Sequence, residues 1–466
     1  MSTSAPASQF RQDSRRLSAD LRHRGLIQTA LGKYEVKRDE KKSLFQDYEG
    51  ARRLAAGRKW EAVNHLDRHL EEFVRRLEAR GTRVHWASTA AQARDLIVGI
   101  AREAGAKSMV KSKAMTAEEI HLNGALEQAG FEVVESDLGE YIVQLRKEAP
   151  YHIVFPAMHL TRGEIRETFE RTLGPVPSDS PEELTLLARR VLRQKYVQAD
   201  VGITGANFAV ADTGMISITE NEGNARLTAA LPRIMITLLG IEKVVPRMED
   251  LALFLPMLAT VGAGQLLSGY NTLYGGPRQA GEADGPEAFH VVLLDNNRTA
   301  LLAQPEEREA LHCIRCGACL NVCPIFRNVG GHTYGTTYSG PIGAVITPHL
   351  RGLQEWKHLA FASSLCGACS EACPVGINLH HQLLHHRKHS AEARPSWWQK
   401  LAFRVFAPVA RSRRAWRLVT LGARWGQHLH PWIKGSVVDP ARAWTRSRDL
   451  APVAPRSFKE WWRDRA

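Results

Sequence analysis

Hydrophobic positions in the first 81 residues recur at the spacing of an amphipathic helix. Trp60, Val63, Leu66, Leu70 and Val74 are three or four positions apart, which places them along one side of a helix. Charged residues occupy most of the positions between them, and Gly81 ends the last helical stretch. Residues 1–81 are therefore predicted to form an N-terminal helical arm.

From Arg83 onwards, short apolar runs alternate with helical stretches. The predicted strands are VHWAS (84–88), SMVKSK (108–113), FEVVES (131–136), HIVFPA (152–157), DVGITG (200–205), GMISIT (214–219), RIMITLLG (233–240) and FHVVLLDN (289–296). The predicted helices cover 89–105 and 116–130, a stretch that ends near Tyr196, and a stretch from about Asp250 to Val261. This alternation is typical of βαβ units, so residues 82–297 are predicted to form an α/β domain with a mostly parallel sheet. The Gly- and Pro-rich segment 275–288 is predicted to be a surface loop within it.

Composition is that of an ordinary globular protein, with 44% hydrophobic residues in a chain of 466. The longest apolar stretch, Leu251 to Gly264, is shorter than the roughly 18 residues that a membrane span needs. The amino terminus contains Ser and Arg but no apolar run resembling a signal peptide. We therefore expect a cytoplasmic protein without a transmembrane helix.

The net charge of +13 is concentrated at the C-terminal end. Residues 391–466 contain sixteen Lys and Arg against five Asp and Glu, so they carry +11 of the total. Eight of the eleven Trp lie in the same region, interleaved with Arg, at positions 397, 398, 416, 425, 432, 444, 461 and 462. Such a region can dock on a protein partner, lie on an anionic membrane surface or bind nucleic acid. We expect partner docking first and peripheral membrane contact second, and we expect no nucleic acid.

All seven cysteines lie in two short runs, which form a predicted domain over residues 298–390. The first run has the spacing C-x2-C-x2-C-x3-C-P, at Cys313, Cys316, Cys319 and Cys323, followed by Pro324. This spacing is typical of bacterial ferredoxins, in which the fourth cysteine binds the other of two [4Fe-4S] clusters. A zinc site with four cysteine ligands is the structural alternative. The spacing and the trailing proline favour iron–sulfur clusters over zinc.

The second run is one cysteine short. It contains Cys366, Cys369 and Cys373, and Ser363 occupies the position that corresponds to Cys313. In the ferredoxin arrangement, cluster 1 takes Cys313, Cys316, Cys319 and Cys373, and cluster 2 takes Cys323, Cys366 and Cys369. The open position on cluster 2 could be filled by water, by nothing, or by a side chain from the set Ser363, Ser364, His380, His381, His385 and His386. We expect seven cysteine ligands and no histidine, because these histidines fit a solvated helix equally well.

Two groups of polar residues in the α/β domain are weaker candidates. Glu220 and Glu222 follow a predicted strand and could act as a nucleophile, but we expect a turn in which the carboxylates are solvated or bind backbone amides. The residues Lys111, Lys113, His121 and Asn207 could bind an anion beside a helix that begins with Thr116 as N-cap and has Glu119 three residues later.

Several long segments resemble the iron–sulfur subunits of lactate-utilisation systems. They are KSKAMTAEEIHLN (111–123), SDLGEYIVQL (136–145), VGITGANFAVADTGMISITENEGNAR (201–226), HCIRCGACLNVCP (312–324) and SLCGACSEACPVGINL (364–379). The resemblance implies a LUD domain, similar to the sugar-isomerase and CoA-transferase fold, and two [4Fe-4S] clusters held by seven cysteines. It also implies a complex that oxidises L-lactate to pyruvate, with a cysteine-rich-domain subunit and a second LUD subunit as partners.

The expected role is that of an electron-transfer subunit with no catalytic residue of its own, which passes electrons to an unidentified acceptor. Gly202 and Gly205 lack the G-x-G-x-x-G spacing of a dinucleotide site, which favours a relay. Two alternatives remain open. The LUD domain could be a ligand-binding or CoA-transferase-like unit whose clusters sense redox state, or the relay could serve another 2-hydroxy acid such as glycolate.

Overall fold

The chain forms two compact units that are divided after Ser390. The structure is a computed structural model that describes residues 6–393, 397–439, 441–445 and 448–465. Residues 1–5 of the predicted arm, and residues 394–396, 440, 446–447 and 466 of the predicted C-terminal region, lie outside the described residues. None of the described helices combines the length and the apolar character that crossing a bilayer requires.

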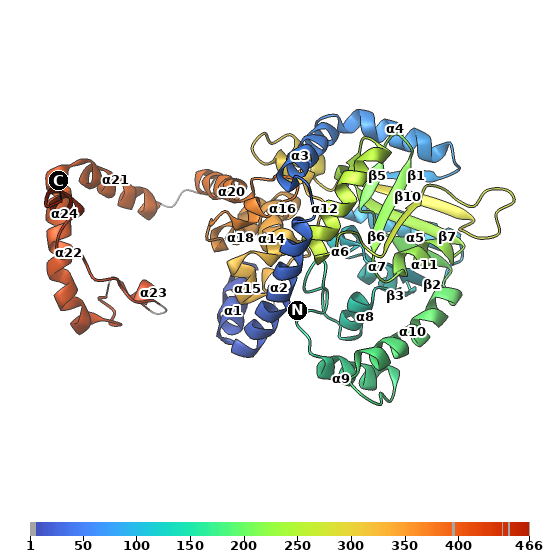
Figure 1. Ribbon diagram of the computed structural model, residues 1–466, viewed down its shortest axis with the longest axis horizontal. Coiled ribbons are helices and arrows are strands. Elements are labelled where there is room, and N and C mark those ends of the chain that lie inside the picture. Colours follow the sequence, from blue (N-terminus) through green and yellow to red (C-terminus); the bar gives the residue numbers. More distant parts are fainter. Residues whose placement is uncertain (1–5, 394–396, 440, 446–447, 466) are drawn as a thin grey trace. The chain divides into compact units, whose positions relative to one another are not determined.

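The N-terminal arm contains four helices, α1 (Pro6–Ala19), α2 (Leu21–Lys42), α3 (Tyr48–Asn64) and α4 (Leu66–Glu78). Val63, Leu66 and Leu70 are buried, whereas Trp60 is exposed. The predicted apolar stripe is not continuous, because His65 leaves the helical conformation and separates α3 from α4. The arm packs onto both the α/β part and the cysteine-containing part, and Figure 1 shows α1 and α2 beside α15 (Pro324–Val329).

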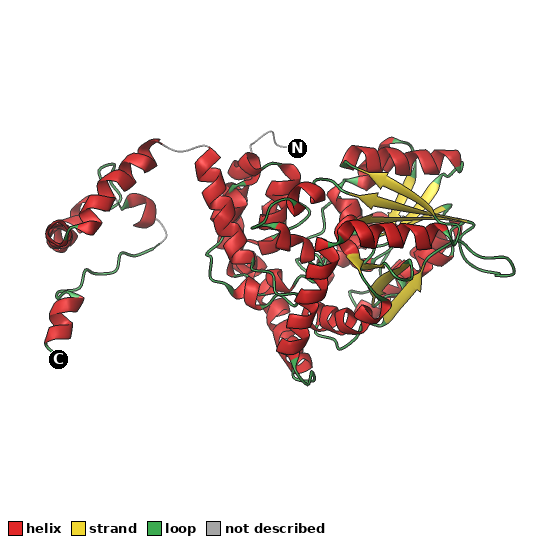
Figure 2. Ribbon diagram, turned by 90° about the horizontal axis from the view of Figure 1, so that it is seen from above, coloured by secondary structure: helices red, strands yellow, loops and turns green. Residues whose placement is uncertain are grey.

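A six-stranded parallel sheet is the framework of the α/β part (Figure 2). Its strands, in spatial order, are β1 (Arg83–Ala87), β10 (Ala288–Leu294), β7 (Ile234–Gly240), β4 (Val201–Thr204), β2 (Ser108–Lys111) and β3 (Glu132–Glu135). Every neighbouring pair is parallel, with β10 and β7 in register from Ala288 with Ile234 to Leu294 with Gly240. The prediction of a mostly parallel sheet over this region is confirmed.

Alternating residues of the central strands belong to two separate hydrophobic cores, one on each face of the sheet. Ile236 and Leu238 of β7 face a core that is closed by α5 (Ala90–Glu103), α6 (Met115–Glu119) and α7 (Leu122–Gln128). Met235 and Leu239 face the opposite core, where α4 covers the sheet. A strand buried on both faces reads as a continuous apolar run, which explains the sequence of residues 233–240.

A second sheet of four short strands was not predicted. It has the order β8 (Val244–Val245), β5 (Phe208–Val210), β6 (Met215–Glu220) and β9 (Tyr270–Tyr274), and the pairs β5–β6 and β6–β9 are antiparallel. The predicted strand 214–219 therefore exists but belongs to this sheet. The loop predicted at 275–288 connects β9 to β10.

The predicted strand at 152–157 is wrong. His152 accepts hydrogen bonds at Nδ1 from the backbone N–H groups of Val154 and Phe155, 3.0 and 3.2 Å away, and Pro156 follows. These local bonds fold the segment into bends because they compete with strand pairing. The same histidine bonds Asn321 at 2.9 Å, so the segment lies against the cysteine-containing part.

The predicted helix 116–130 is divided into α6 and α7, because His121 adopts a left-handed conformation with φ of 53°. The remaining helices of the α/β part are α8 (Leu138–Leu145), α9 (Arg162–Leu173), α10 (Pro181–Gln198), α11 (Asn224–Ala230) and α12 (Leu251–Ala263), with 3-10 turns at Ile241–Lys243 and Met248–Asp250. The predicted helices near Tyr196 and at 250–261 correspond to α10 and α12.

The cysteine-containing part is helical. Its elements are α13 (Arg298–Leu302), 3-10 turns at Arg308–His312 and His332–Tyr334, α14 (Ala318–Asn321), α15, α16 (Gly340–Arg351), α17 (Leu353–Trp356), α18 (His358–Ala362), α19 (Ala368–Glu371) and α20 (Leu379–Ala393). Ile27, Phe254, Leu320 and Leu383 belong to one hydrophobic cluster. The arm, the α/β part and the cysteine-containing part therefore share a core.

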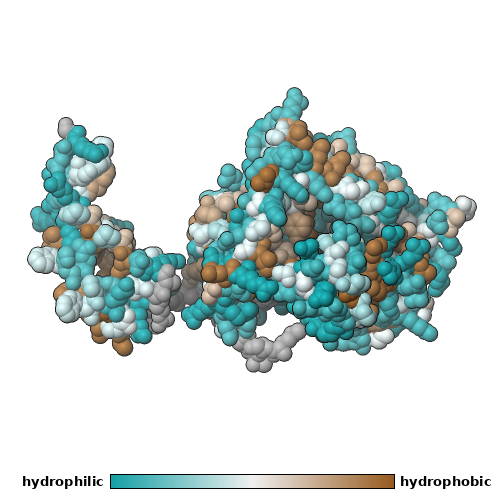
Figure 3. All heavy atoms as spheres, turned by 60° about the horizontal axis from the view of Figure 1, so that its bottom comes forward, coloured by the Kyte–Doolittle hydropathy of each residue, from teal (hydrophilic) through white to brown (hydrophobic). Residues whose placement is uncertain are grey.

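The second unit contains α21 (Trp397–Arg411), α22 (Arg413–Ile433), α23 (Arg442–Thr445) and α24 (Phe458–Arg463). No side chain of α21 or α22 is buried. All eight tryptophans of the region are exposed, and Figure 3 shows apolar side chains among polar ones on its visible surface. The helices thus present aromatic and basic side chains to solvent.

Candidate iron–sulfur site and the adjoining pocket

Four cysteines from both runs surround one cavity. Cys313 and Cys316 lie on the loop before α14, Cys319 lies within α14, and Cys373 follows α19 in the second run. The rest of the cavity wall is largely apolar, with Ile314, Ile342, Val375, Ile377 and Leu379 among its side chains. The structure thus brings together the four residues that the sequence predicts for cluster 1.

Backbone N–H groups point at the sulfur atoms of this group. The N–H of Arg315 donates to Sγ of Cys313, and the N–H of Ile377 donates to Sγ of Cys373, each at 3.4 Å. Donors of this kind stabilise the negative charge of a thiolate and tune the reduction potential of a bound cluster. The surroundings of the four cysteines therefore fit a [4Fe-4S] cluster.

Burial and mutual repulsion raise the pKa of these thiols. Burial is the main cause for Cys316 and Cys319, and neighbouring cysteines of the same group add to it. The pKa of Cys373 rises to about 12 through burial and then through Cys313. A bound metal reverses this effect, because a coordinating thiol is deprotonated outright. The group is thus unfavourable as free thiolates and favourable as metal ligands.

The other three cysteines form a second group. Burial raises the pKa of Cys369 to about 11, with Cys323 as the next cause and Cys366 as a further one. Burial raises the pKa of Cys323, and Cys366 adds to the effect. These mutual effects indicate that Cys323 is near Cys366 and Cys369, although it belongs to the first run. Among the residues that the structure describes, no three His, Cys, Asp or Glu side chains are placed to hold a single metal ion.

Ser363 occupies the place in the second loop that Cys313 has in the first. Its Oγ accepts a hydrogen bond from the N–H of Leu365 at 3.1 Å, just as Sγ of Cys313 accepts from Arg315. Leu365 and Arg315 share a positive φ, of 56° and 61°, and the glycines after the next cysteine, Gly367 and Gly317, have φ of 85° and 79°. The two loops therefore have the same local fold, with a hydroxyl where the eighth thiol would be.

Replacing Ser363 with cysteine is expected to make cluster 2 more resistant to air. A thiolate is a stronger ligand for iron than a serine oxygen, and the loop already has the conformation that a ligand requires. Iron retained after timed exposure to oxygen is the measurement, with Ser364→Cys, one residue along and exposed, as the matched control. Equal iron loss in Ser363→Cys and in the unaltered protein would show that residue 363 does not reach the cluster.

The histidines of α20 are only partly solvated. His381 is exposed, as expected, but His386 is buried and its Nε2 lies 3.0 Å from the carbonyl oxygen of Val345. His380 bonds the hydroxyl of Ser370 at 2.7 Å through Nδ1. The prediction of a fully solvated face is therefore wrong for His386, because the helix packs against α16.

A buried ion network joins the α/β part to the first cysteine loop. Glu242, which is 1% exposed, accepts from Nε of Arg298 at 2.5 Å and from Nη2 of Arg315 at 3.2 Å. Arg298 also pairs with Glu119 at 2.8 Å, and the Tyr338 hydroxyl donates to the same carboxylate at 2.7 Å. Burial alone would raise the pKa of Glu242, but Arg298 and Arg315 lower it to about 2. Sequence reasoning missed this network, since its members are scattered along the chain.

The pocket beside the cysteine loop has a volume of about 240 Å³. Of the predicted anion-binding residues, Lys113 and Asn207 line it, whereas Lys111 and His121 do not. Lys111 is fully buried and pairs with Glu135 at 2.8 Å and with Glu118 at 3.1 Å. The predicted N-cap at Thr116 is wrong, because α6 begins at Met115 with Ala114 as its N-cap and Glu119 is bound to Arg298.

The carboxylates of Glu220 and Glu222 accept hydrogen bonds from nearby backbone N–H groups, as in a turn. Glu220 accepts hydrogen bonds from the N–H groups of Ala225 and Arg226 at 2.6 and 2.8 Å. Glu222 is exposed and accepts from the N–H of Asn221 at 3.1 Å. Both carboxylates thus bind backbone amides, in agreement with the expectation.

Comparison with known proteins matches three stretches of the chain to families. Residues 70–294 match the LUD domain, residues 309–377 match a 4Fe-4S dicluster domain, and residues 378–466 match the C-terminal domain of lactate utilisation protein B. The second match confirms the [4Fe-4S] cofactors that the cysteine spacing predicts.

Whole-length relatives carry the name lactate utilization protein B. The protein from Oceanobacillus iheyensis is 43% identical over 449 residues, which cover 95% of this chain and 93% of that protein. The protein from Bacillus subtilis is 41% identical over 450 residues, with the same coverage of 95% and 93%. Among solved structures, a DUF162 family protein from Deinococcus radiodurans is 16% identical with a TM-score of 0.27, covering 49% of this chain and 98% of its own.

Proposed function

Because the chain belongs to the lactate utilization protein B family, we propose that it is the iron–sulfur electron-transfer subunit of a complex that oxidises L-lactate to pyruvate. The observation that carries this proposal is the convergence of cysteines from two distant runs on one cavity. In two-cluster ferredoxins, the last cysteine of each run binds the cluster that the other run holds.

The ligand sets follow from the two groups of thiols. Cys313, Cys316, Cys319 and Cys373 hold cluster 1, and Cys323, Cys366 and Cys369 hold cluster 2, with the Ser363 position completing the second loop. When bound, [4Fe-4S] clusters accept and release single electrons. The apolar walls of the first cavity exclude water from its thiolates, and the backbone donors of Arg315 and Ile377 stabilise their charge.

The buried ion network has a positioning role in this proposal. Glu242 holds Arg315, which lies between the first two ligands of cluster 1, against the end of β7. Arg298 joins Glu242 to Glu119, the Tyr338 hydroxyl donates to Glu119, and the guanidinium of Arg315 lies 4.8 Å from the centre of the Tyr338 ring. The first cysteine loop is therefore held rigidly on the α/β part, as an electron-transfer site requires.

The partners are a cysteine-rich-domain subunit, a second LUD subunit and an electron acceptor. The exposed tryptophans and arginines of α21, α22 and α24 support docking on such a partner, with peripheral membrane contact as the second use. A reducing cytoplasm suits a protein whose seven cysteines must stay available as ligands. We also propose that the LUD part is similar to the sugar-isomerase and CoA-transferase fold.

Electron paramagnetic resonance of the complex tests this function. Adding L-lactate to the anaerobic, oxidised complex is expected to produce the signals of reduced clusters in this chain, whereas the isolated chain with L-lactate is expected to stay oxidised. Glycolate serves as the matched substrate control and tests the relay for another 2-hydroxy acid. Reduction of the isolated chain by L-lactate at the rate of the complex would contradict the role of a relay.

A further inference from the structure

Helix α3 of the N-terminal arm lies against the loops that hold cluster 1. It packs on the 3-10 turn Arg308–His312, which ends directly before Cys313, and on the short strand β8. Arg52, near the start of the helix, donates from Nε to the carbonyl oxygen of Cys373 at 2.7 Å. The helix therefore lies beside both ligand loops of cluster 1, although it precedes residue 70, where the first family match begins.

Lys59, two turns further along α3, is a buried cation at this contact. It is 1% exposed, and its Nζ donates to the carbonyl oxygens of Glu242 and Val244 at 2.7 and 3.2 Å. Carbonyl oxygens satisfy the donors of an ammonium group but carry no full negative charge. These two hydrogen bonds therefore hold Lys59 in place and leave its charge to be compensated by other groups.

The charged neighbours of Lys59 include a ligand of cluster 1. Burial lowers the pKa of Lys59, and Glu242 opposes this effect most strongly. The Glu242 carboxylate is already paired with two buried arginines. Lys243 and Arg315 lower the pKa of Lys59 further, and Cys313 is the second group that raises it. Lys59 is therefore near Cys313, and its nearest carboxylate is shared with other cations.

The buried charges of the ion network beside cluster 1 are positive in excess. Three cations and two carboxylates meet there, namely Lys59, Arg298, Arg315, Glu119 and Glu242. The further cation Lys243 lines the adjoining pocket together with the carboxylates of Asp137, Glu220 and Glu222. A [4Fe-4S] cluster with four thiolate ligands is an anion, and reduction adds one more negative charge to it. Such a cluster would compensate the excess positive charge of the network.

From this geometry we infer that Lys59 of the N-terminal arm is a counter-charge of cluster 1 and raises the reduction potential of that cluster. A buried ammonium stabilises the reduced form more than the oxidised form, because reduction adds negative charge close to it and little water screens the two charges. The inference rests on the proposed function for the presence of cluster 1. It gives the arm a part in the electron-transfer site.

The effect is expected at cluster 1 and not at cluster 2. Burial raises the pKa of Cys323, and the cation that opposes this effect is Arg327. The side chain of Arg327 is 25% exposed and pairs with Glu35 at 2.6 Å, so its charge is compensated within the chain. The two clusters therefore have different surroundings, and a change at Lys59 should move one potential and leave the other as it is.

Redox titration of the anaerobic full-length chain, followed by electron paramagnetic resonance, tests the role of Lys59. Lys59→Gln removes the charge but keeps an amide donor for the carbonyl oxygens. It is expected to lower the equilibrium constant for reduction of cluster 1 at least about tenfold, which corresponds to about 59 mV for a one-electron couple. Lys59→Arg, which keeps the charge, is expected to retain the potential. The signal of cluster 1 is the one that Cys313→Ala lacks.

Arg53→Gln is the matched control for Lys59→Gln. Arg53 lies on the same helix, but its side chain is 73% exposed and pairs with Asp47 at 3.7 Å, so solvent and salt screen its charge. Its replacement is expected to leave both potentials unchanged.

An unchanged potential of cluster 1 in Lys59→Gln, or an equal fall for both clusters, would overturn the inference. If Lys59→Gln did not retain cluster 1, its retention by Lys59→Arg would support the counter-charge, and its loss from Lys59→Arg as well would contradict it. An iron count of about eight in the unaltered chain would leave the proposed function standing in each of these cases.

Discussion

Replacing Cys373 with alanine is expected to abolish cluster 1, although Cys373 belongs to the second cysteine run. The side chain lines the same cavity as Cys313, Cys316 and Cys319, and its pKa responds to Cys313. Loss of one thiolate from a four-cysteine site leaves an iron without its protein ligand, so about four iron atoms per chain should be lost. Iron analysis and electron paramagnetic resonance of the anaerobically purified variant measure this.

The matched variant is Cys323→Ala, which lies in the first run but is expected to abolish cluster 2. The pair Cys373→Ala and Cys313→Ala should thus lose one spectral species, and the pair Cys323→Ala and Cys366→Ala should lose the other. If Cys373→Ala lost the same species as Cys366→Ala, each run would hold its own cluster and the crossed arrangement would be wrong.

Replacing Glu242 with glutamine is expected to lower the free energy of unfolding by about 3–5 kcal/mol, which is the usual cost of removing one partner from a buried ion pair. The carboxylate is 1% exposed and faces Arg298 and Arg315, so its loss leaves two buried guanidinium groups without their shared counter-charge. Denaturant unfolding of the cluster-free protein measures the change, because bound clusters complicate two-state behaviour.

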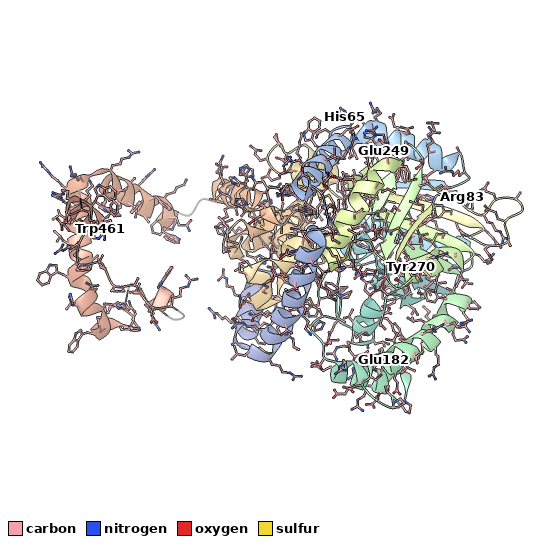
Figure 4. The ribbon with its side chains drawn as sticks, viewed as in Figure 1. His65, Arg83, Glu182, Glu249, Tyr270 and Trp461 are labelled. Atoms are coloured by element: carbon pink, nitrogen blue, oxygen red, sulfur yellow. The ribbon has the colours of Figure 1, made fainter. Side chains whose placement is uncertain are left out.

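Glu249→Gln is the control for Glu242→Gln. Glu249 lies at the surface (Figure 4), pairs with Arg247 at 2.8 Å and is 66% exposed, so its replacement should change stability by less than about 1 kcal/mol. Similar unfolding of both variants would show that the network does not hold the interface.

The free energy of unfolding is also expected to depend on pH through Glu242. Since the pKa of Glu242 is lowered from 4.5 to about 2 on folding, its contribution to stability is complete above pH 4.5 and is lost as the pH falls towards 2.

The sheet was predictable because its strands are buried on both faces. Continuous apolar runs such as 233–240 have no other simple interpretation when they alternate with helices. The segment 152–157 has the same apolar character but makes bends, since His152 bonds two backbone amides and Asn321. Tertiary contact with the cysteine-containing part determines its conformation, and local pattern carries no signal of that contact.

The candidate site was predictable where its residues lie close together in the sequence. The spacing of seven cysteines in two short runs, with the trailing proline, favours iron–sulfur clusters over zinc, and the position of Ser363 follows from aligning the runs. The network around Glu242 could not be predicted, because it depends on which strand ends meet at one edge of the sheet. A glutamate after a strand has no distinctive spacing from the arginines that it pairs with.

The iron content of the anaerobically purified full chain, measured together with its resonance spectrum after reduction, tests the central claim most directly. Two clusters held by seven cysteines predict about eight iron atoms per chain and the signals of two reduced [4Fe-4S] clusters. About four iron atoms would contradict the second cluster, and zinc in place of iron would contradict both.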